Sequence, residues 1–222
     1  MEVKIVYFEK EGEENTDVVL ALAKKRAGEL GIKNIVVAST KGNTAVKAVN
    51  VFSGFNVVAV THVFGGREPN TAEFLEENRK LVESKGGKIL TTAHAFGGIN
   101  QALQSTGRMP PPGAGLQPAG GTPQSQRAGA PGGGPPAGGV PPARSGTGDI
   151  IASTLGIFGR GMKVACEISA MAADAGLVRC DEDIIAIAGT HAGADVAVVL
   201  QPANAHRFFD TRIKEIICKP RT

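Results

Sequence analysis

The sequence predicts an α/β protein built on a mostly parallel, mixed sheet with helices on both faces. Segments with strand and helix patterns alternate in units of about 25 to 30 residues, which is typical of strand–helix–strand repeats. The core must consist mainly of Val, Ile, Leu and Ala, because the chain has no Trp, one Tyr and nine Phe. Such a core suits a parallel sheet covered by helices. A short link at 190–196 joins two late strand segments and indicates an antiparallel strand at the end of the sheet.

The first half of the chain supplies four strand segments separated by helical ones. The strands are rich in apolar residues and are expected at 3–8, 34–40, 56–62 and 88–94. The helices are expected at 18–30, 43–52, 71–86 and, as a short one, 98–104. Asn15, Thr16 and Asp17 offer N-cap chemistry to the first helix, and Gly31 ends it. Asn43 is the N-cap candidate of the second helix.

The same alternation resumes in the last third of the chain. Asp149 is an N-cap candidate for a helix beginning DIIASTLGIFG, and a very apolar helix is expected at 161–177. The last strand segments are expected at 183–190, 196–200 and 213–219. We therefore interpret residues 1–222 as one domain that is interrupted by one insert.

The insert is residues 107–148. Of these 42 residues, 13 are Gly and 10 are Pro, so the segment cannot bury enough apolar surface to offset the entropy of ordering it. Its glycines have no period of three, which excludes collagen. We expect a disordered loop, and recruitment of a partner through its Pro-rich sequence is an alternative left open.

Charge and apolar patterning argue against nucleic acid and membrane partners. The net charge is +3, and Arg108, Arg127 and Arg144 lie in the insert, which has no acidic residue. The rest of the chain therefore nets to zero and offers no basic face for phosphates. No apolar run approaches the roughly 20 residues of a membrane span, and the N-terminus lacks a signal-peptide apolar region. We expect a soluble, cytoplasmic protein whose three cysteines, without CxxC spacing, are reduced thiols.

Polar clusters follow several strand segments, and one of them is a short sequence motif that occurs twice. HVFGG at 62–66 and HAFGG at 94–98 follow successive strands. Parallel strands end at the same edge of a sheet, which we call the rim, and α/β proteins bind ligands there. Further clusters of hydroxyls and glycines follow other strands at 39–44 and 189–193. The rim is therefore the predicted ligand site.

The stretch STKGNTA at 39–45 is the strongest local indication of a ligand. It follows a strand and opens a helix. It combines small hydroxyls, a lysine and a glycine with the free N–H groups of a helix start, which suit a phosphate. It matches neither GxxxxGK[ST] nor GxGxxG, so it is not a standard nucleotide motif. An ordinary capped strand–helix turn is the alternative.

Two stretches resemble the C-terminal domain of pyruvate kinase. IVVASTKGNTAVKAVNVFSGFNVVAVTH at 35–62 resembles its phosphate-binding stretch, and DIIAIAGTHAGADVAVVL at 183–200 resembles its second, returning stretch. Outside the insert, residues 1–106 and 149–222 resemble the stand-alone pyruvate kinase alpha/beta-domain-like proteins of archaea and bacteria. The phrases KIVYFEKEGEENT, TAHAFGG, MKVACEISAMAADAGL, PANAHRFFD and KEIICKPR support this resemblance.

The resemblance implies a three-layer α/β/α domain with a five-stranded mixed sheet that binds a phosphorylated ligand, flavin mononucleotide (FMN) above all. It implies no pyruvate kinase activity, since that chemistry belongs to a barrel domain of about 250 residues. By position, the phosphate would be held by Ser39, Thr40, Lys41, Gly42, Asn43 and Thr44. The same rim would be lined by Thr61, His62, His94, Gly189, Thr190 and Gly193, with Phe64 and Phe96 beside a flat ring.

The chain departs from this family pattern in two places. The loop after Thr190 usually carries an arginine in that family, whereas here it reads His191-Ala192-Gly193. This change weakens the expectation of a phosphate contact from the loop. The insert at 107–148 replaces a short connection, and it could cover the ligand site if it emerges beside the rim.

The rim histidines have two further interpretations. His62, His94 and His191 could gather as a zinc site, but none has a tight i, i+4 spacing, and no metal is predicted. His94 and His62 are the candidates for a general acid or base.

Four more side chains have a structural and a functional interpretation. Glu167 lies four residues after Lys163, which predicts an ion pair, and a buried carboxylate facing the ligand is the alternative. Asp195 precedes a strand and is expected to cap a turn rather than to act in catalysis. Phe208 and Phe209 are expected in the core or in a subunit contact.

Three functions follow, in order of preference: a module that binds a phosphorylated ligand, a small enzyme with a rim histidine as acid or base, and an interaction protein. A second copy of the chain is the further partner left open.

Overall fold

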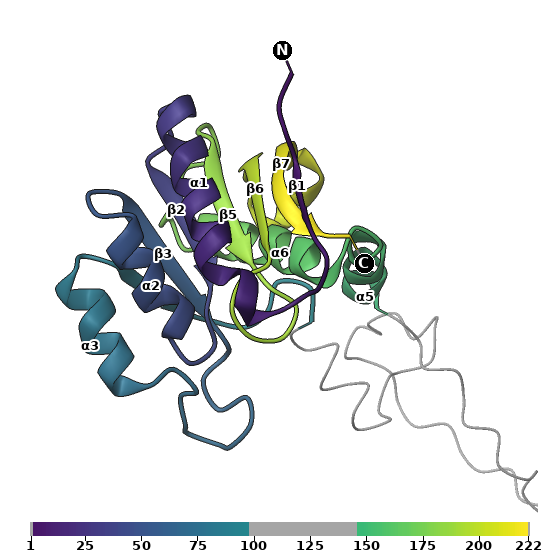
Figure 1. Cartoon of the computed structure of the whole chain (residues 1–222). Helices are drawn as coiled ribbons and strands as arrows, with labels where there is room; N and C mark the ends of the chain where they lie inside the picture. Colours follow the sequence, from purple (N-terminus) through teal and green to yellow (C-terminus); the bar gives the residue numbers. More distant parts are fainter. Residues whose placement is uncertain (1, 98–145, 222) are drawn as a thin grey trace, which may run out of the picture.

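The computed structural model describes residues 2–97 and 146–221. The centre of this part of the chain is a seven-stranded sheet in the order β1-β7-β6-β5-β2-β3-β4 (Figure 1). The strands are β1 Val6–Phe8, β2 Asn34–Ala38, β3 Asn56–Thr61, β4 Lys88–Thr91, β5 Ile184–Ala188, β6 Val196–Gln201 and β7 Arg212–Pro220. The expectation of five strands is therefore wrong. It came from the family resemblance, whereas the seven segments with strand patterns all lie in this sheet.

The sheet is mixed because one strand runs against the others. β5, β2, β3 and β4 are parallel to their neighbours in this group, and β1 is parallel to β7. β6 is antiparallel to both β5 and β7. The link from Ala188 to Val196 is too short for a helical crossover, so β6 has to turn back beside β5. The antiparallel strand expected from this link is thus confirmed.

Helices cover both faces of the sheet. Among the described residues they are η1 Glu13–Asn15, α1 Thr16–Leu30, α2 Asn43–Val51, α3 Glu76–Ser84, α5 Thr147–Gly156, α6 Arg160–Asp174 and η2 Ala205–Asp210. α1, α2 and α3 lie in a row on one face, while α6 crosses the other face and α5 packs against α6 (Figure 1). The expected alternation of strands and helices is therefore present as three layers.

The central strands are buried on both sides, which explains their uninterrupted apolar sequence. On β5, Ile185 and Ile187 face the α1–α2 side, whereas Ile184 and Ala186 face α6. All four side chains are fully buried. Strands buried in this way read as continuous apolar runs, since neither face meets water.

Several element boundaries differ from those expected. α3 begins at Glu76 rather than at residue 71, because Leu75 is extended and bonds to another loop. Gly42, not Asn43, occupies the N-cap position of α2. Asp149 is the third residue of α5 rather than its N-cap, and its Oδ2 accepts the N–H of Gly146 at 2.9 Å.

The expected insert is only partly described. α5 begins at Thr147, so the last two residues of the segment 107–148 are helical. The rest of the insert up to residue 145, and the short helix expected at 98–104, lie outside the described residues.

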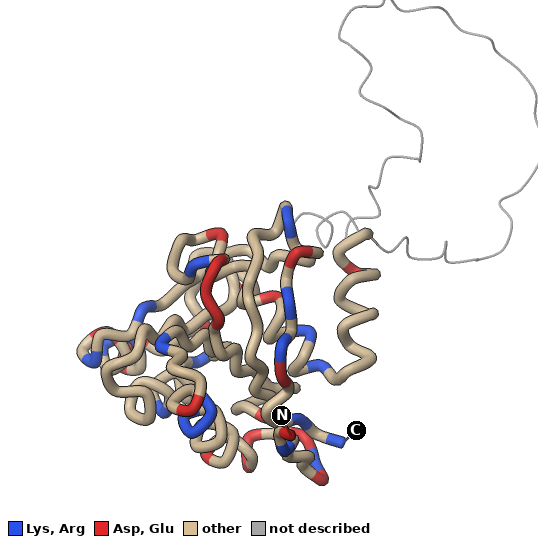
Figure 2. The backbone as a smooth tube through the Cα atoms, turned by 90° about the horizontal axis from the view of Figure 1, so that it is seen from above, with Lys and Arg blue, Asp and Glu red and all other residues tan. Residues whose placement is uncertain are grey.

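The described helices include none that is long and apolar enough to cross a membrane. Lys and Arg positions are interspersed with Asp and Glu positions along the described chain (Figure 2). Some of these charges join elements, such as Arg26 of α1, whose Nη2 lies 2.6 Å from Glu215 Oε1 on β7.

Candidate functional site

The order of strands reverses at β2. The chain proceeds from β2 outward to β3 and β4, and after α6 it places β5 on the other side of β2. In open α/β sheets, ligands bind at the carboxyl ends of the strands beside such a reversal. The loops after β2 and β5 therefore flank the expected crevice. The loops after β3 and β4 continue the same rim.

The loop after β2, residues 39–42, is held in one conformation, and we call it the glycine loop. Gly42 has a φ of +99°, which is rarely open to other residues. A Cβ at this position would lie 2.6 Å from Asn78 Cβ and 2.7 Å from Phe74 Cε1. The backbone of Gly42 thus requires a glycine both for its conformation and for the space around it.

The start of α2 presents N–H groups at the glycine loop. Val46 N donates to Gly42 O as the first bond of the helix, so the N–H groups of residues 42–45 have no acceptor within the helix. Ala45 N donates to Ser39 Oγ at 3.2 Å. The N–H groups of Gly42, Asn43 and Thr44 have no acceptor among the described residues, and consecutive N–H groups at a helix start favour an anion.

The segment around the start of α3 braces the glycine loop from outside. Leu75 N donates to Lys41 O at 3.2 Å, and Asn78 Nδ2 donates to the same carbonyl at 2.9 Å. Asn78 Nδ2 also reaches Asn43 Oδ1 at 2.9 Å. The side-chain oxygen of Asn43 is therefore engaged within the loop, and its expected contact with a phosphate stays a prediction. Sequence reasoning missed Asn78, although a polar residue on the buried face of an amphipathic helix was an available signal.

The end of β3 adds Thr61 and His62 to the glycine loop. Thr61 Oγ1 donates to Thr40 O at 3.1 Å, and His62 Nε2 lies 3.4 Å from Thr40 Oγ1. His62 Nδ1 lies 2.9 Å from Glu73 Oε1, and the other oxygen of Glu73 lies 3.0 Å from Arg67 Nε. Neither Glu73 nor Arg67 was expected at the rim, because nothing in their local sequence points to His62.

The loop after β4 brings His94 to a buried carboxylate on α6. Glu167 is 2% exposed, and its Oε2 lies 2.5 Å from Lys163 Nζ and 3.7 Å from His94 Nδ1. Its Oε1 accepts the N–H of Phe96 at 3.2 Å. Burial by itself would raise the pKa of Glu167, but His94, Lys163 and the Phe96 N–H stabilise the charged form and lower the pKa to about 2. The expected Lys163–Glu167 ion pair is confirmed.

The two copies of HxFGG place their histidines together but not their phenylalanines. The rings of His62 and His94 meet edge to face with 5.4 Å between centroids. Phe64 is 57% exposed, whereas Phe96 is 7% exposed and packs against Phe208 at 5.0 Å. Phe96 therefore belongs to the core and does not offer a free surface to a flat ring, contrary to expectation.

The loop after β5 packs against the start of α1. Gly193 has a φ of +72°, and a Cβ there would collide with Thr16 Oγ1. Ala194 N donates to Thr16 Oγ1 at 2.9 Å. A Cβ at Gly189 would lie 2.5 Å from Gly193 O. Packing thus accounts for a glycine at both positions, and their place in the ligand site stays a prediction.

The same loop ends in Asp195, which is fully buried. Its Oδ2 accepts the N–H groups of Thr190 at 3.2 Å and Gly12 at 3.1 Å, which confirms the expected turn cap. His191 is exposed. Within the described ranges, no group of three or more His, Cys, Asp or Glu side chains is arranged to hold a metal ion.

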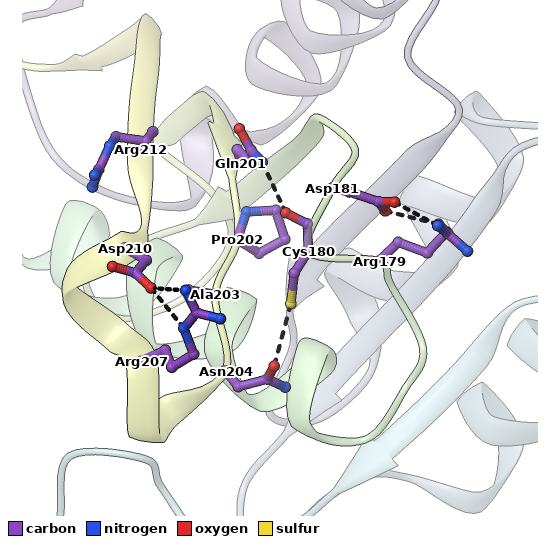
Figure 3. Close-up of a pocket in the computed structure, with 10 residues that line it drawn as sticks. All are labelled: Arg179, Cys180, Asp181, Gln201, Pro202, Ala203, Asn204, Arg207, Asp210 and Arg212. Carbon is purple, nitrogen blue, oxygen red and sulfur yellow. Dashed lines mark hydrogen bonds and ion pairs between the residues drawn. The ribbon is translucent and has the colours of Figure 1, made fainter.

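A hollow of about 650 Å³ lies away from the rim, between the turn after α6 and η2 (Figure 3). Arg207 and Arg179 each pair there with a neighbouring carboxylate, Asp210 and Asp181. Cys180 Sγ points to Asn204 Oδ1 at 3.5 Å. The hollow is open, and two of its three arginines, Arg179 and Arg207, are already paired with carboxylates. We therefore place the candidate site at the rim, where the strand reversal and the glycine loop coincide.

The fold and the rim define an α/β domain with ligand loops at a strand reversal. Residues 17–108 match the family model described as "Pyruvate kinase, alpha/beta domain". The matched range includes the glycine loop, His62 and His94, but not β5, β6 or β7. Over this range the resemblance inferred from the sequence is confirmed.

Proposed function

We propose that this protein binds a phosphorylated ligand at the rim, and that the ligand is FMN. The observation that carries the proposal is the glycine loop, which leads into α2 with three N–H groups, those of Gly42, Asn43 and Thr44, that no described residue accepts. It lies beside the strand reversal, where α/β sheets bind ligands, and within the part of the chain that matches the pyruvate kinase alpha/beta domain.

The rim residues fit a phosphate and part of a flavin. The three N–H groups and the exposed Lys41 supply donors and positive charge for a phosphate. Phe64 is the exposed aromatic side chain on the rim that could lie against an isoalloxazine ring. The FMN proposal rests mainly on the phosphate end, because Phe96 is occupied in the core.

The first test is the visible absorption spectrum of the protein purified from cells, with mass spectrometry of any compound released on unfolding. A flavin spectrum supports the proposal. Thr40→Glu should abolish the flavin spectrum, because a carboxylate then lies where the phosphate binds. Asn50→Glu adds the same charge at the exposed far end of α2 and should leave the spectrum unchanged.

A colourless protein that also takes up no added FMN would rule out the flavin. Binding of sugar phosphates, lost in Thr40→Glu, would then keep the phosphate site and change only the ligand. If the protein binds neither FMN nor sugar phosphates, the proposed function is wrong.

A second function, acid–base catalysis on the bound ligand, is favoured by one observation. Both rim histidines turn Nδ1 toward a carboxylate, Glu73 or Glu167, as histidines that transfer protons often do. Turnover of the bound ligand with added reductants or substrates tests this function. His62→Gln and His94→Gln should lower the turnover rate more than the affinity, and a ligand that never turns over contradicts it.

A further inference from the structure

His62 has a different hydrogen-bond partner on each ring nitrogen. Nδ1 lies 2.9 Å from Glu73 Oε1, and Nε2 lies 3.4 Å from Thr40 Oγ1 of the glycine loop. The His62 side chain is 42% exposed, whereas that of Glu73 is 13% exposed. One nitrogen therefore faces a mostly buried carboxylate, and the other faces the rim.

The carboxylate limits which nitrogen can carry the proton. An ionised carboxylate only accepts hydrogen bonds, so the short contact requires a proton on Nδ1. In the neutral ring Nε2 is then an acceptor. Arg67 Nε, 3.0 Å from the second oxygen of Glu73, keeps that carboxylate in place.

We propose that Glu73 is a positioning residue of the ligand site, which holds His62 as the Nδ1–H tautomer and presents Nε2 as an acceptor beside the glycine loop. Nε2 has one lone pair, which faces the Thr40 hydroxyl at 3.4 Å. The ligand group that fits this acceptor is a hydroxyl next to the phosphate, which would replace Thr40 as the donor, because a hydroxyl can donate and a deprotonated phosphate oxygen cannot. The choice of FMN, whose ribityl chain carries such hydroxyls, rests on the proposed function. The tautomer of His62 is inferred from the contact with Glu73 alone and does not depend on that function.

His94 shows that this arrangement is particular to His62. Its Nδ1 lies 3.7 Å from Glu167 Oε2, which is longer than a hydrogen bond. The Glu167 carboxylate already has two partners, Lys163 Nζ at 2.5 Å and the N–H of Phe96, which donates to it. Thr40, His94 and Glu73 all lie beside His62. Of these three, Glu73 is the one whose group can only accept, so it is Glu73 that selects the tautomer.

The tautomer is measured on the full chain by long-range ¹H–¹⁵N NMR of the histidine rings, and is assigned from the spectra of the neutral ring. We expect wild-type His62 to carry its proton on Nδ1. Glu73→Met keeps the side-chain length but removes the acceptor, so both tautomers should appear. His191 and His206 are exposed, serve as references in the same spectra, and should not change.

The matched control is Glu77→Met on α3. Glu77 is exposed and has no hydrogen bond or ion pair among the described residues, so its loss removes the same charge without touching His62. His62 should remain the Nδ1–H tautomer in this variant. A change equal to that in Glu73→Met would mean that charge, and not the contact, sets the tautomer, and would overturn the proposal.

FMN affinity, measured by quenching of flavin fluorescence, gives the second readout. Loss of one hydrogen bond should weaken FMN binding roughly threefold to tenfold in Glu73→Met and leave it unchanged in Glu77→Met. Wild-type His62 with its proton on Nε2, or Glu73→Met with the proton still only on Nδ1, would overturn the proposal.

Two further results keep the test decisive. If Glu73→Met does not fold, the wild-type spectrum and the Glu73→Gln variant test the proposal instead. Glutamine has a single acceptor oxygen, for which Arg67 competes with His62, so both tautomers of His62 should appear in this variant. If wild type binds no FMN, FMN is ruled out as the ligand, while the tautomer still decides the role of Glu73.

Discussion

Replacing Glu167 with glutamine should remove a large share of the stability of this protein at neutral pH. Glu167 is 2% exposed, joins α6 to the loop after β4 through the N–H of Phe96, and pairs with Lys163 on its own helix. Its pKa falls from 4.5 to about 2 in the folded protein. At about 1.4 kcal/mol per pKa unit, this corresponds to a contribution on the order of 3 kcal/mol to the free energy of unfolding.

The pH dependence of this contribution has a definite sign. The folded pKa lies below the unfolded one, so the unfolded chain binds more protons between them. The stabilisation is therefore complete above a pH of about 4.5 and is lost as the pH falls toward about 2. Urea unfolding of wild type and Glu167→Gln at a series of pH values measures it. The difference between the two proteins should be largest at neutral pH and shrink through this window.

Two results would refute the reasoning about Glu167. One is a difference below about 1 kcal/mol at neutral pH, and the other is a difference that stays constant between the two pKa values. Asp181→Asn is the control, because Asp181 pairs with Arg179 on the surface, where water screens the charges. Its unfolding free energy should follow that of wild type at each pH.

Two other predictions concern the glycine loop and the cysteines. Gly42→Ala should lower the free energy of unfolding by about 2 kcal/mol more than Gly54→Ala in urea unfolding, because both have a positive φ but only Gly42 lacks room for a Cβ. Equal losses would contradict this. A thiol reagent should modify only Cys180 in the native protein, because burial raises the pKa of Cys166 to about 11 and of Cys218 to about 12. Rapid modification of all three before unfolding would show that the two buried thiols are accessible.

The strands were predictable because their pattern depends on local physics. Runs such as Ile35–Val37 and Ile184–Ala188 are apolar throughout, which is typical of strands buried on both faces. The direction of β6 was also predictable, since the short link after Gly189 permits only an antiparallel return. All seven segments with strand patterns lie in the sheet, whereas the number of five strands, which came from the resemblance to a family, was wrong.

The rim was predictable as a place but not as a set of contacts. Parallel strands end at one edge, so His62 and His94 had to approach each other. Which side chains meet them depends on segments that fold back from elsewhere. Glu73 comes from the connection before α3, and Glu167 comes from the opposite face of the sheet.

The sequence by itself determined the strand and helix alternation, the rim and the glycine loop, since each follows from hydrophobic pattern, chain direction and backbone chemistry within a few residues. The tertiary structure decided the roles that depend on distant neighbours. It brought Phe96 into the core against Phe208, gave Gly193 to packing against Thr16, and placed Glu73 on His62. Side-chain environments of this kind come from packing several elements together, and no local pattern records which partners that packing selects.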